Sequence, residues 1–216
     1  MPIERNMIRK LLNILAVVAV LAGCGTEVED MPEKVGYLAV DLSYDYDTQT
    51  KAEDVNPADF DIIISGPVNI TSKCADLPEI IELTPGAYTV TVQSPEDEPA
   101  AFDQPIYGCS ATFEIVEDAT TSVKLICTML NMKVTVNPSQ AFMSQVQDFE
   151  VTVTNGYGQL SWTKADVAQG KAGYFIVAPM TVSLRGVSVN GTPLSYDGFI
   201  FDVEASDHHV LSFDSF

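Results

Sequence analysis

Histidine and tryptophan are nearly absent from this chain, and basic residues are scarce. Among its 216 residues are two histidines, one tryptophan and 11 basic side chains, against 30 acidic ones. His208 and His209 are adjacent, so in a strand they would point to opposite faces. No nucleophile stands at a credible spacing from either, and Cys-x-x-Cys pairs and glycine-rich phosphate loops are lacking. The sequence therefore predicts no enzyme, no metal site and no cofactor.

The shortage of positive charge also excludes a class of partner. The formal net charge is −19, and a surface with this excess of carboxylates repels phosphate backbones and anionic lipid heads. We expect no nucleic-acid binding. The carboxylates are interpreted mainly as a solvated coat that keeps the protein dispersed.

Long apolar runs are lacking apart from one, Leu11 to Ala22, which follows Arg9 and Lys10. A helix needs about 20 apolar residues to span a bilayer, so this run of 12 is too short. Its basic start, short apolar middle and closing Leu21-Ala22-Gly23-Cys24 are typical of a bacterial lipoprotein signal. We predict that residues 1–23 are removed and that Cys24 carries the lipid that anchors the protein to the outer membrane.

An acidic segment, residues 24–34, follows the anchor. It resembles the export signal that takes Bacteroidota lipoproteins to the outer face of the outer membrane, which implies a chain facing the cell exterior. Removal of residues 1–23 takes three of the 11 basic and one of the 30 acidic residues, leaving 193 residues with 8 basic and 29 acidic side chains and a net charge of −21. This length is sufficient for a sizeable core.

Long amphipathic helices are lacking, and a period of two prevails after the acidic segment. Alternating apolar residues predict half-buried strands, which turn residues separate at short intervals. This pattern indicates an all-β protein of antiparallel sandwiches. The predicted strands span 37–43, 60–65, 88–93, 113–116, 123–128, 132–136, 149–154, 182–184 and 199–203.

Turn and cap residues predict local pairing. Asn155-Gly156 indicates a two-residue hairpin that sets Val151 opposite Leu160 and Phe149 opposite Trp162. Asn190-Gly191 predicts a hairpin with Val189 opposite Thr192, and Pro193 confines its second strand to a sheet edge. Two short helices are expected, one with Asn137 as N-cap and one from Thr163 to Gly170.

A weak internal repeat divides the chain. Residues 59–64 match 148–153 at a displacement of 89, and Phe113, Ile115, Val123 and Leu125 match Phe201, Val203, Leu211 and Phe213 at a displacement of 88. Matching core positions in one order favour two tandem β-sandwich domains, residues 35–131 and 132–216. Residues 123–136 run almost unbroken through this boundary, with Asn131 as the expected bend.

Three cysteines remain after the anchor: Cys74, Cys109 and Cys127. A hairpin turning at residues 117–119 would place Cys109 opposite Cys127, with Ala111 opposite Leu125. In an exported protein a disulfide here would close a loop of about 18 residues and contribute roughly 3 kcal/mol. Two small buried apolar side chains are the alternative interpretation. The odd number leaves at least one thiol outside any such bond.

Several motifs together resemble a known family. Leu83-x-Pro85-Gly86-x-Tyr88-x-Val90 is followed by Ala101-Phe102-Asp103-Gln104-Pro105-x-Tyr107, by Phe113-x-Ile115-Val116 and by Cys127-Thr128. This series, over about residues 35 to 137, resembles the domain of unknown function numbered 4493 (DUF4493), a Bacteroidota lipoprotein family. The resemblance implies an architecture similar to the fimbrillin superfamily of pilins, pilus anchors and tip adhesins, with Ig-like or transthyretin-like sandwiches.

The resemblance leads to a functional hypothesis. Fimbrillin stalk subunits resemble one another in a basic cleavage site, whereas the one arginine after the signal here is Arg185, so an anchor or tip is favoured over a stalk. We expect a non-catalytic structural or adhesive surface lipoprotein that contacts other fimbrial subunits or host and glycan surfaces. The alternative is a carbohydrate-binding lipoprotein of a glycan-uptake system. Candidate partner-binding residues are Tyr44, Tyr46, Phe102 and Tyr107.

Overall fold

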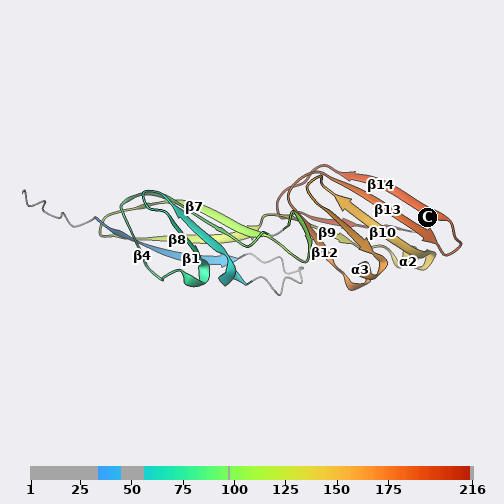
Figure 1. Cartoon of the computed structure of the whole chain (residues 1–216), viewed down its shortest axis with the longest axis horizontal. Coiled ribbons are helices and arrows are strands. Elements are labelled where there is room, and N and C mark those ends of the chain that lie inside the picture. Colours follow the sequence, from blue (N-terminus) through green and yellow to red (C-terminus); the bar gives the residue numbers. More distant parts are fainter. Residues whose placement is uncertain (1–33, 45–55, 97, 215–216) are drawn as a thin grey trace, which may run out of the picture. The chain divides into compact units, whose positions relative to one another are not determined.

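The computed structural model describes residues 34–44, 56–96 and 98–214. The predicted lipoprotein signal, Cys24, Tyr46 and nearly all of the acidic segment lie outside the described residues. Within the described part the protein is all-β, with short helical turns between strands (Figure 1). No helix in this part is long and apolar enough to cross a membrane.

The first set of strands comprises β1 to β5, β7 and β8. These seven strands are hydrogen-bonded in the order β3-β2-β5-β7-β8-β1-β4, with β1 and β8 parallel. Two 3-10 turns, η1 (Pro57–Asp59) and η2 (Cys74–Asp76), flank β2 and β3. The strands are β1 (Gly36–Tyr44), β2 (Asp61–Ser65), β3 (Ile70–Lys73), β4 (Ile81–Leu83), β5 (Gly86–Gln93), β7 (Tyr107–Ile115) and β8 (Thr120–Met129).

The second set comprises β9 to β15. Four strands form a sheet in the order β11-β10-β13-β14, and a second sheet has the order β15-β9-β12-β6. The helices α2 (Gln140–Gln145) and α3 (Lys164–Gln169) connect strands of this set. The strands are β9 (Met132–Val136), β10 (Val146–Thr154), β11 (Gln159–Thr163), β12 (Ala172–Phe175), β13 (Met180–Ser188), β14 (Pro193–Ile200) and β15 (His208–Leu211).

The strand order of the two sets corresponds. β10 lies between β11 and β13 as β2 lies between β3 and β5, and β14 and β15 take the places of β7 and β8. β15 runs parallel to β9 and β12 antiparallel to it, as β8 and β4 do beside β1. The weak repeat in the sequence therefore has a structural counterpart.

One short strand links the two sets. β6 (Ala100–Phe102) pairs with β12, with Phe102 opposite Gly173. β12 in turn places Tyr174 in the first apolar core and Phe175 in the second. A domain boundary between residues 131 and 132 stays a prediction, because residues on both of its sides share a sheet.

Asn131 stands at the break between β8 and β9. It is 3% exposed, its Oδ1 accepts from the Ile106 N–H at 3.1 Å, and its Nδ2 donates to the Gln104 carbonyl at 3.2 Å. The side chain replaces ladder bonds that the backbone loses at the bend. The expected bend at Asn131 is thus found.

Both predicted hairpin registers were wrong. Asn155 Oδ1 accepts from the N–H groups of Tyr157 and Gly158, which creates a four-residue loop and pairs Val151 with Trp162 instead of Leu160. The second hairpin has a three-residue loop ending at Gly191, whose φ is +81°, so Ser188, and not Val189, lies opposite Thr192. The Asn155 side chain lengthens the first turn, and the left-handed conformation of Gly191 lengthens the second.

Two other expectations need correction. The first helix takes Ser139 as its N-cap, because Asn137 and Ser139 still donate backbone hydrogen bonds to Leu211 and Phe213. The predicted strand 199–203 is wrong beyond Ile200, where β14 ends. The second helix has the expected Thr163 N-cap and ends at Gly170 in the left-handed conformation.

Candidate functional site

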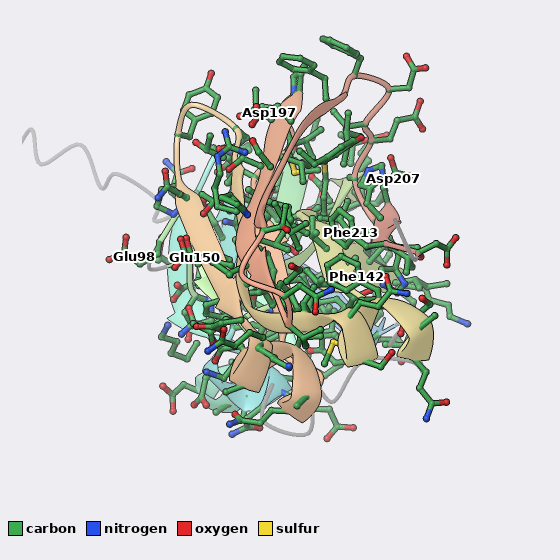
Figure 2. The ribbon with its side chains drawn as sticks, turned by 90° about the vertical axis from the view of Figure 1, so that its right-hand side faces the viewer. Glu98, Phe142, Glu150, Asp197, Asp207 and Phe213 are labelled. Atoms are coloured by element: carbon green, nitrogen blue, oxygen red, sulfur yellow. A yellow bond between two sulfur atoms is a disulfide. The ribbon has the colours of Figure 1, made fainter. Side chains whose placement is uncertain are left out.

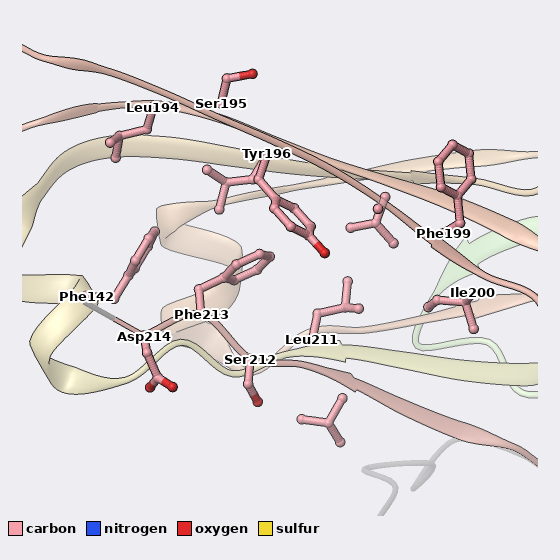
Figure 3. Close-up of a pocket in the computed structure, with 14 residues that line it drawn as sticks. Phe142, Leu194, Ser195, Tyr196, Phe199, Ile200, Leu211, Ser212, Phe213 and Asp214 are labelled. Atoms are coloured by element: carbon pink, nitrogen blue, oxygen red, sulfur yellow. The ribbon is translucent and has the colours of Figure 1, made fainter. Parts of the chain in front are cut away.

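An apolar groove of about 540 Å³ opens between β14 and β15 (Figure 3). Leu194 and Tyr196 point from β14 toward Leu211 and Phe213 on the other side. The floor includes Val182 and Leu184 of β13, which are 4% and 3% exposed. The other lining residues are Phe142, Ser195, Gly198, Phe199, Ile200, Val210, Ser212 and Asp214.

The two strands that border the groove do not pair with each other. Among the described residues, β14 bonds to β13 and β15 bonds to β9. The contact across the groove is made by side chains. The rings of Tyr196 and Phe213 meet edge to face at 6.1 Å (Figure 3), and Phe213 packs on Phe142 at 5.8 Å (Figure 2). β14 is therefore an edge strand that faces an apolar cleft, and no strand of the described structure pairs with this edge.

The corresponding strands of the first set, β7 and β8, are joined at one end. β7 and β8 pair at Tyr107 with Met129 and at Gly108 with Thr128, and the Cys109 and Cys127 sulfurs are bonded at 2.03 Å in the next position. Further along, Thr121 Oγ1 donates to the Glu114 carbonyl at 2.9 Å. The first set thus has two backbone pairs and a disulfide at one end of β7 and β8, whereas β14 and β15 have no such pairs in the described structure.

The cysteine hairpin differs from its predicted form beyond the disulfide. Ala111 pairs with Val90 of β5, whereas Leu125 pairs with Leu42 of β1, so the predicted Ala111–Leu125 pair is wrong. The strands separate because each joins a different part of the sheet. The thiol of Cys74 is free, and burial raises its pKa.

Three of the side chains proposed from sequence as partner contacts, Tyr44, Phe102 and Tyr107, lie in or against the cores, and the fourth, Tyr46, lies outside the described residues. Tyr107 is 0% exposed, which makes it a core residue and not a surface contact. Tyr44 packs edge to face on Phe60 at 5.2 Å, and Phe102 packs in the same way on Trp162 at 5.1 Å. Trp162 itself is 0% exposed, so it offers no surface for a sugar ring.

Exposed aromatic rings occur elsewhere, at the end of β14. Phe199 and Phe201 are 64% and 70% exposed and stack on each other with 5.7 Å between their centroids. Phe199 also lines the groove, whereas Phe201 lines a separate hollow of about 470 Å³. Sequence reasoning missed this site because it placed Phe201 in a strand core. Pro193, which marked an edge strand, was the one available signal.

The metal-ligating side chains of the described part lie apart from one another. No group of three metal-ligating side chains converges there. His208 Nε2 lies 2.9 Å from Thr135 Oγ1, and His209 Nε2 lies 3.7 Å from an Asp207 oxygen. The largest change in pKa is at Asp166, which lies in the N-terminal cap of α3. Hydrogen bonds from Lys171 and Thr163 lower its pKa to about 2.

Comparison with known proteins gives the family. No curated protein sequence matches. One similar solved structure is a candidate cell-adhesion protein of Bacteroides eggerthii, with 10% identity and a TM-score of 0.49 over 85% of this chain and 87% of the other. A second is a candidate adhesin of Bacteroides ovatus, with 10% identity and a TM-score of 0.48 over 88% of this chain and 90% of the other. A third is the tip fimbrial protein Mfa3 of Porphyromonas gingivalis, with 11% identity and a TM-score of 0.45 over 77% of this chain and 81% of the other. Residues 34–215 match the family described as "Domain of unknown function (DUF4493)", so the chain belongs to the DUF4493 family.

Proposed function

We propose that the protein is a lipid-anchored structural or adhesive protein of the outer cell surface, and that it holds an extended segment of a partner surface protein in the groove between β14 and β15. The observation that carries this proposal is the unpaired edge of β14 beside an apolar cleft. Unpaired strand edges accept an additional strand through main-chain hydrogen bonds.

The side chains of β14 suit such a segment. Leu194, Tyr196, Gly198 and Ile200 occupy alternate positions along the strand and line the groove. A Cβ atom at Gly198 would lie 2.7 Å from the Tyr196 hydroxyl, so glycine keeps space beside that ring. A partner strand with apolar side chains at every second position would therefore fill the cleft between β14 and β15.

The first set of strands supports this choice of occupant. There the edges of β7 and β8 are joined by backbone pairs at Tyr107 and Gly108 and by the Cys109–Cys127 bond. The corresponding strands β14 and β15 lack such pairs in the described structure. At that end the partner of β7 is a strand, and the free edge of β14 offers backbone groups of the same kind to a strand.

The predicted lipid at Cys24 is consistent with this role. A diacylated or triacylated cysteine binds a membrane far more firmly than one chain, since each buried CH₂ contributes about 0.8 kcal/mol. The residues after it carry a net charge of −21 by the count from sequence, 8 basic against 29 acidic. Location on the outer face of the outer membrane and a non-catalytic role are part of the proposal.

Photo-crosslinking on living cells tests the groove. A benzophenone amino acid replaces Tyr196 in the groove or, as a control, Tyr157, which is 68% exposed in the 155–158 loop. We expect an adduct with a surface protein from position 196 and none from 157, and loss of that adduct when Gly198→Val fills the space beside the ring. Equal adducts from both positions would contradict the proposal.

Protease treatment of intact cells tests the location. Cleavage of the chain on whole cells is expected if the protein faces outward, and Cys24→Ala should release it from the membrane fraction. Protection until the cells are lysed would exclude the proposed surface location. The same cells, with and without the chain, are then compared for adhesion to a surface or to other cells.

A further inference from the structure

The hollow beyond the end of β14 combines an aromatic wall with carboxylates. It has a volume of about 470 Å³ and is lined by five residues of one loop, Phe201, Asp202, Val203, Glu204 and Asp207. We refer to it as the acidic hollow. Phe201 stacks on Phe199, and Phe199 lines the groove, so the acidic hollow adjoins the groove through this ring pair.

The loop that forms the acidic hollow is held in place by hydrogen bonds. Ser206 has a φ of +68°, its hydroxyl donates to the Met129 carbonyl at 2.6 Å, and its N–H donates to the Asn131 carbonyl at 3.0 Å. The Glu204 N–H donates to Asp207 Oδ2 at 2.7 Å. These bonds fix the carboxylate-bearing loop to the break between β8 and β9, so the hollow is set before a ligand arrives.

The chemistry of the walls favours a cation. Phe201 exposes 70% of its surface, and the face of an aromatic ring attracts an ammonium or guanidinium group within about 6 Å of its centre. In the described chain no lysine or arginine forms an ion pair with Asp202 or Glu204, whose carboxylates are exposed. Asp207 has the nearby His209 at 3.7 Å.

A metal ion does not fit this arrangement. The described carboxylates do not converge as a group of three that could hold an ion. An organic cation with an apolar stem is a better match, because the stem would lie against Phe201 and Val203 while the charged head meets the carboxylates. Lysine and arginine side chains have this form.

We propose that the acidic hollow binds a lysine or arginine side chain of a basic partner protein. The inference rests on the proposed function, since the basic residue would belong to the segment that lies in the groove and passes Phe199 and Phe201. The strongly negative surface of the chain draws such a partner toward it at long range. The acidic hollow then selects a lysine or arginine side chain at one position of the partner, which distant carboxylates cannot do.

Fluorescence anisotropy with synthetic peptides tests the selection. Two labelled ten-residue peptides of alternating valine and threonine end in two arginines or in two citrullines, which have the same shape without the charge. At about 150 mM salt, where charges more than about 8 Å apart are screened, we expect the arginine peptide to bind at least ten-fold more tightly. Equal binding would overturn the acidic hollow and leave the groove standing.

Matched variants separate the hollow from general charge attraction. Asp202→Asn with Glu204→Gln removes two charges from the hollow, and Glu79→Gln with Glu82→Gln removes two exposed charges elsewhere. The first pair should abolish the arginine preference and the second should keep it. Equal losses in both would overturn the proposal. Phe201→Ala should weaken binding several-fold, whereas Tyr157→Ala, at another exposed ring, should not.

A second probe covers failure of the groove itself. If neither valine–threonine peptide binds, the proposed groove is contradicted, and hepta-arginine then tests the hollow alone with the same two double variants. Loss of hepta-arginine binding in the Asp202→Asn/Glu204→Gln protein alone supports the hollow. A glycan array in which Phe201→Ala removes binding, with no effect on either peptide, would assign the ring pair to sugars and overturn the proposal.

Discussion

Tyr196 and Phe213 meet edge to face across the groove, with 6.1 Å between their ring centroids and an angle of 77° between their planes. The contact joins β14 to the segment after β15 without a backbone bond. Because Tyr196 is 53% exposed, its ring can turn away at little cost in buried area. The groove is thus closed at this point by a side chain that an incoming strand can displace.

The two rings should differ in their contribution to stability. Phe213 packs on Phe142, which is 3% exposed, so Phe213→Ala should lower the free energy of unfolding by about 2 kcal/mol. Tyr196→Ala should cost less than about 1 kcal/mol, because half of its ring already faces water. Guanidinium denaturation followed by circular dichroism measures both, with Tyr157→Ala as the exposed control. Equal costs for Tyr196 and Phe213 would contradict this account.

The disulfide should be a major stabilising feature of the first set. Replacing Cys109 and Cys127 together with alanine opens a loop of 18 residues and should cost roughly 3 kcal/mol in the chain-entropy account. Cys74→Ala, which leaves the disulfide intact, serves as the control.

Thiol counting checks the same bond directly. A protein that begins after Cys24 should react with one maleimide per chain when unfolded without reductant, at Cys74, and with three after reduction. Three reactive thiols before reduction would show that Cys109 and Cys127 are not bonded.

Gly173 should tolerate no side chain. A Cβ atom there would lie 2.4 Å from Trp162 Cζ2 and 2.8 Å from Leu160 Cδ1, and both side chains belong to the second core. Gly173→Ala should therefore displace Trp162 and destabilise the fold by about 1–3 kcal/mol, the range of overpacked cores. The emission of the single tryptophan, buried in the wild type, should shift to the red.

Gly156 provides the matched control for Gly173. It has a φ of +82°, and a Cβ atom added there would have no other atom within 4 Å, so alanine at this position meets backbone strain alone. The cost of Gly156→Ala should stay near 1 kcal/mol, with tryptophan emission unchanged. A larger cost at Gly156 than at Gly173 would contradict the packing argument.

Alternation predicted most strands because their faces have a strict inside and outside. Tyr88 to Gln93 and Phe149 to Thr154 lie within β5 and β10, and the buried residues on them alternate as expected. β12 was not predicted, because all four of its residues are buried and no polar position marks an alternation. Strands covered on both faces cannot be recognised by period two.

The groove could not be predicted from the alternation of apolar residues along single strands. Phe201 has the spacing of a core residue, yet β14 ends one position earlier and leaves its ring exposed beside Phe199. Whether two neighbouring strands pair is decided by tertiary packing. The Cys109–Cys127 pair was predictable because the short turn at 117–119 fixes its register, whereas the longer 201–207 connection imposes no register on β14 and β15.

The cap of α3 should make stability depend on acid pH. Asp166 accepts hydrogen bonds from Lys171 Nζ and from the Thr163 backbone N–H, which lower its pKa from an ordinary value of 3.8 to about 2. A carboxyl group with a lowered pKa stabilises the fold fully above pH 4, and this contribution disappears as the pH falls from about 4 to about 2. Lys171 also lies 5.4 Å from the centre of the Phe102 ring, so the cap helps to hold β6 against the second set.

Asp166→Asn isolates this contribution from that of the other carboxylates. The variant should be less stable than the wild type at pH 7, and the difference between the two unfolding free energies should shrink to near zero at pH 2. Glu79→Gln, which removes an exposed carboxylate in the first set, should follow the wild-type curve throughout. Denaturant titrations at half-unit steps between pH 2 and pH 7 measure the difference. A gap that stays constant across this window would show that the Lys171 and Thr163 bonds do not select the charged form of Asp166.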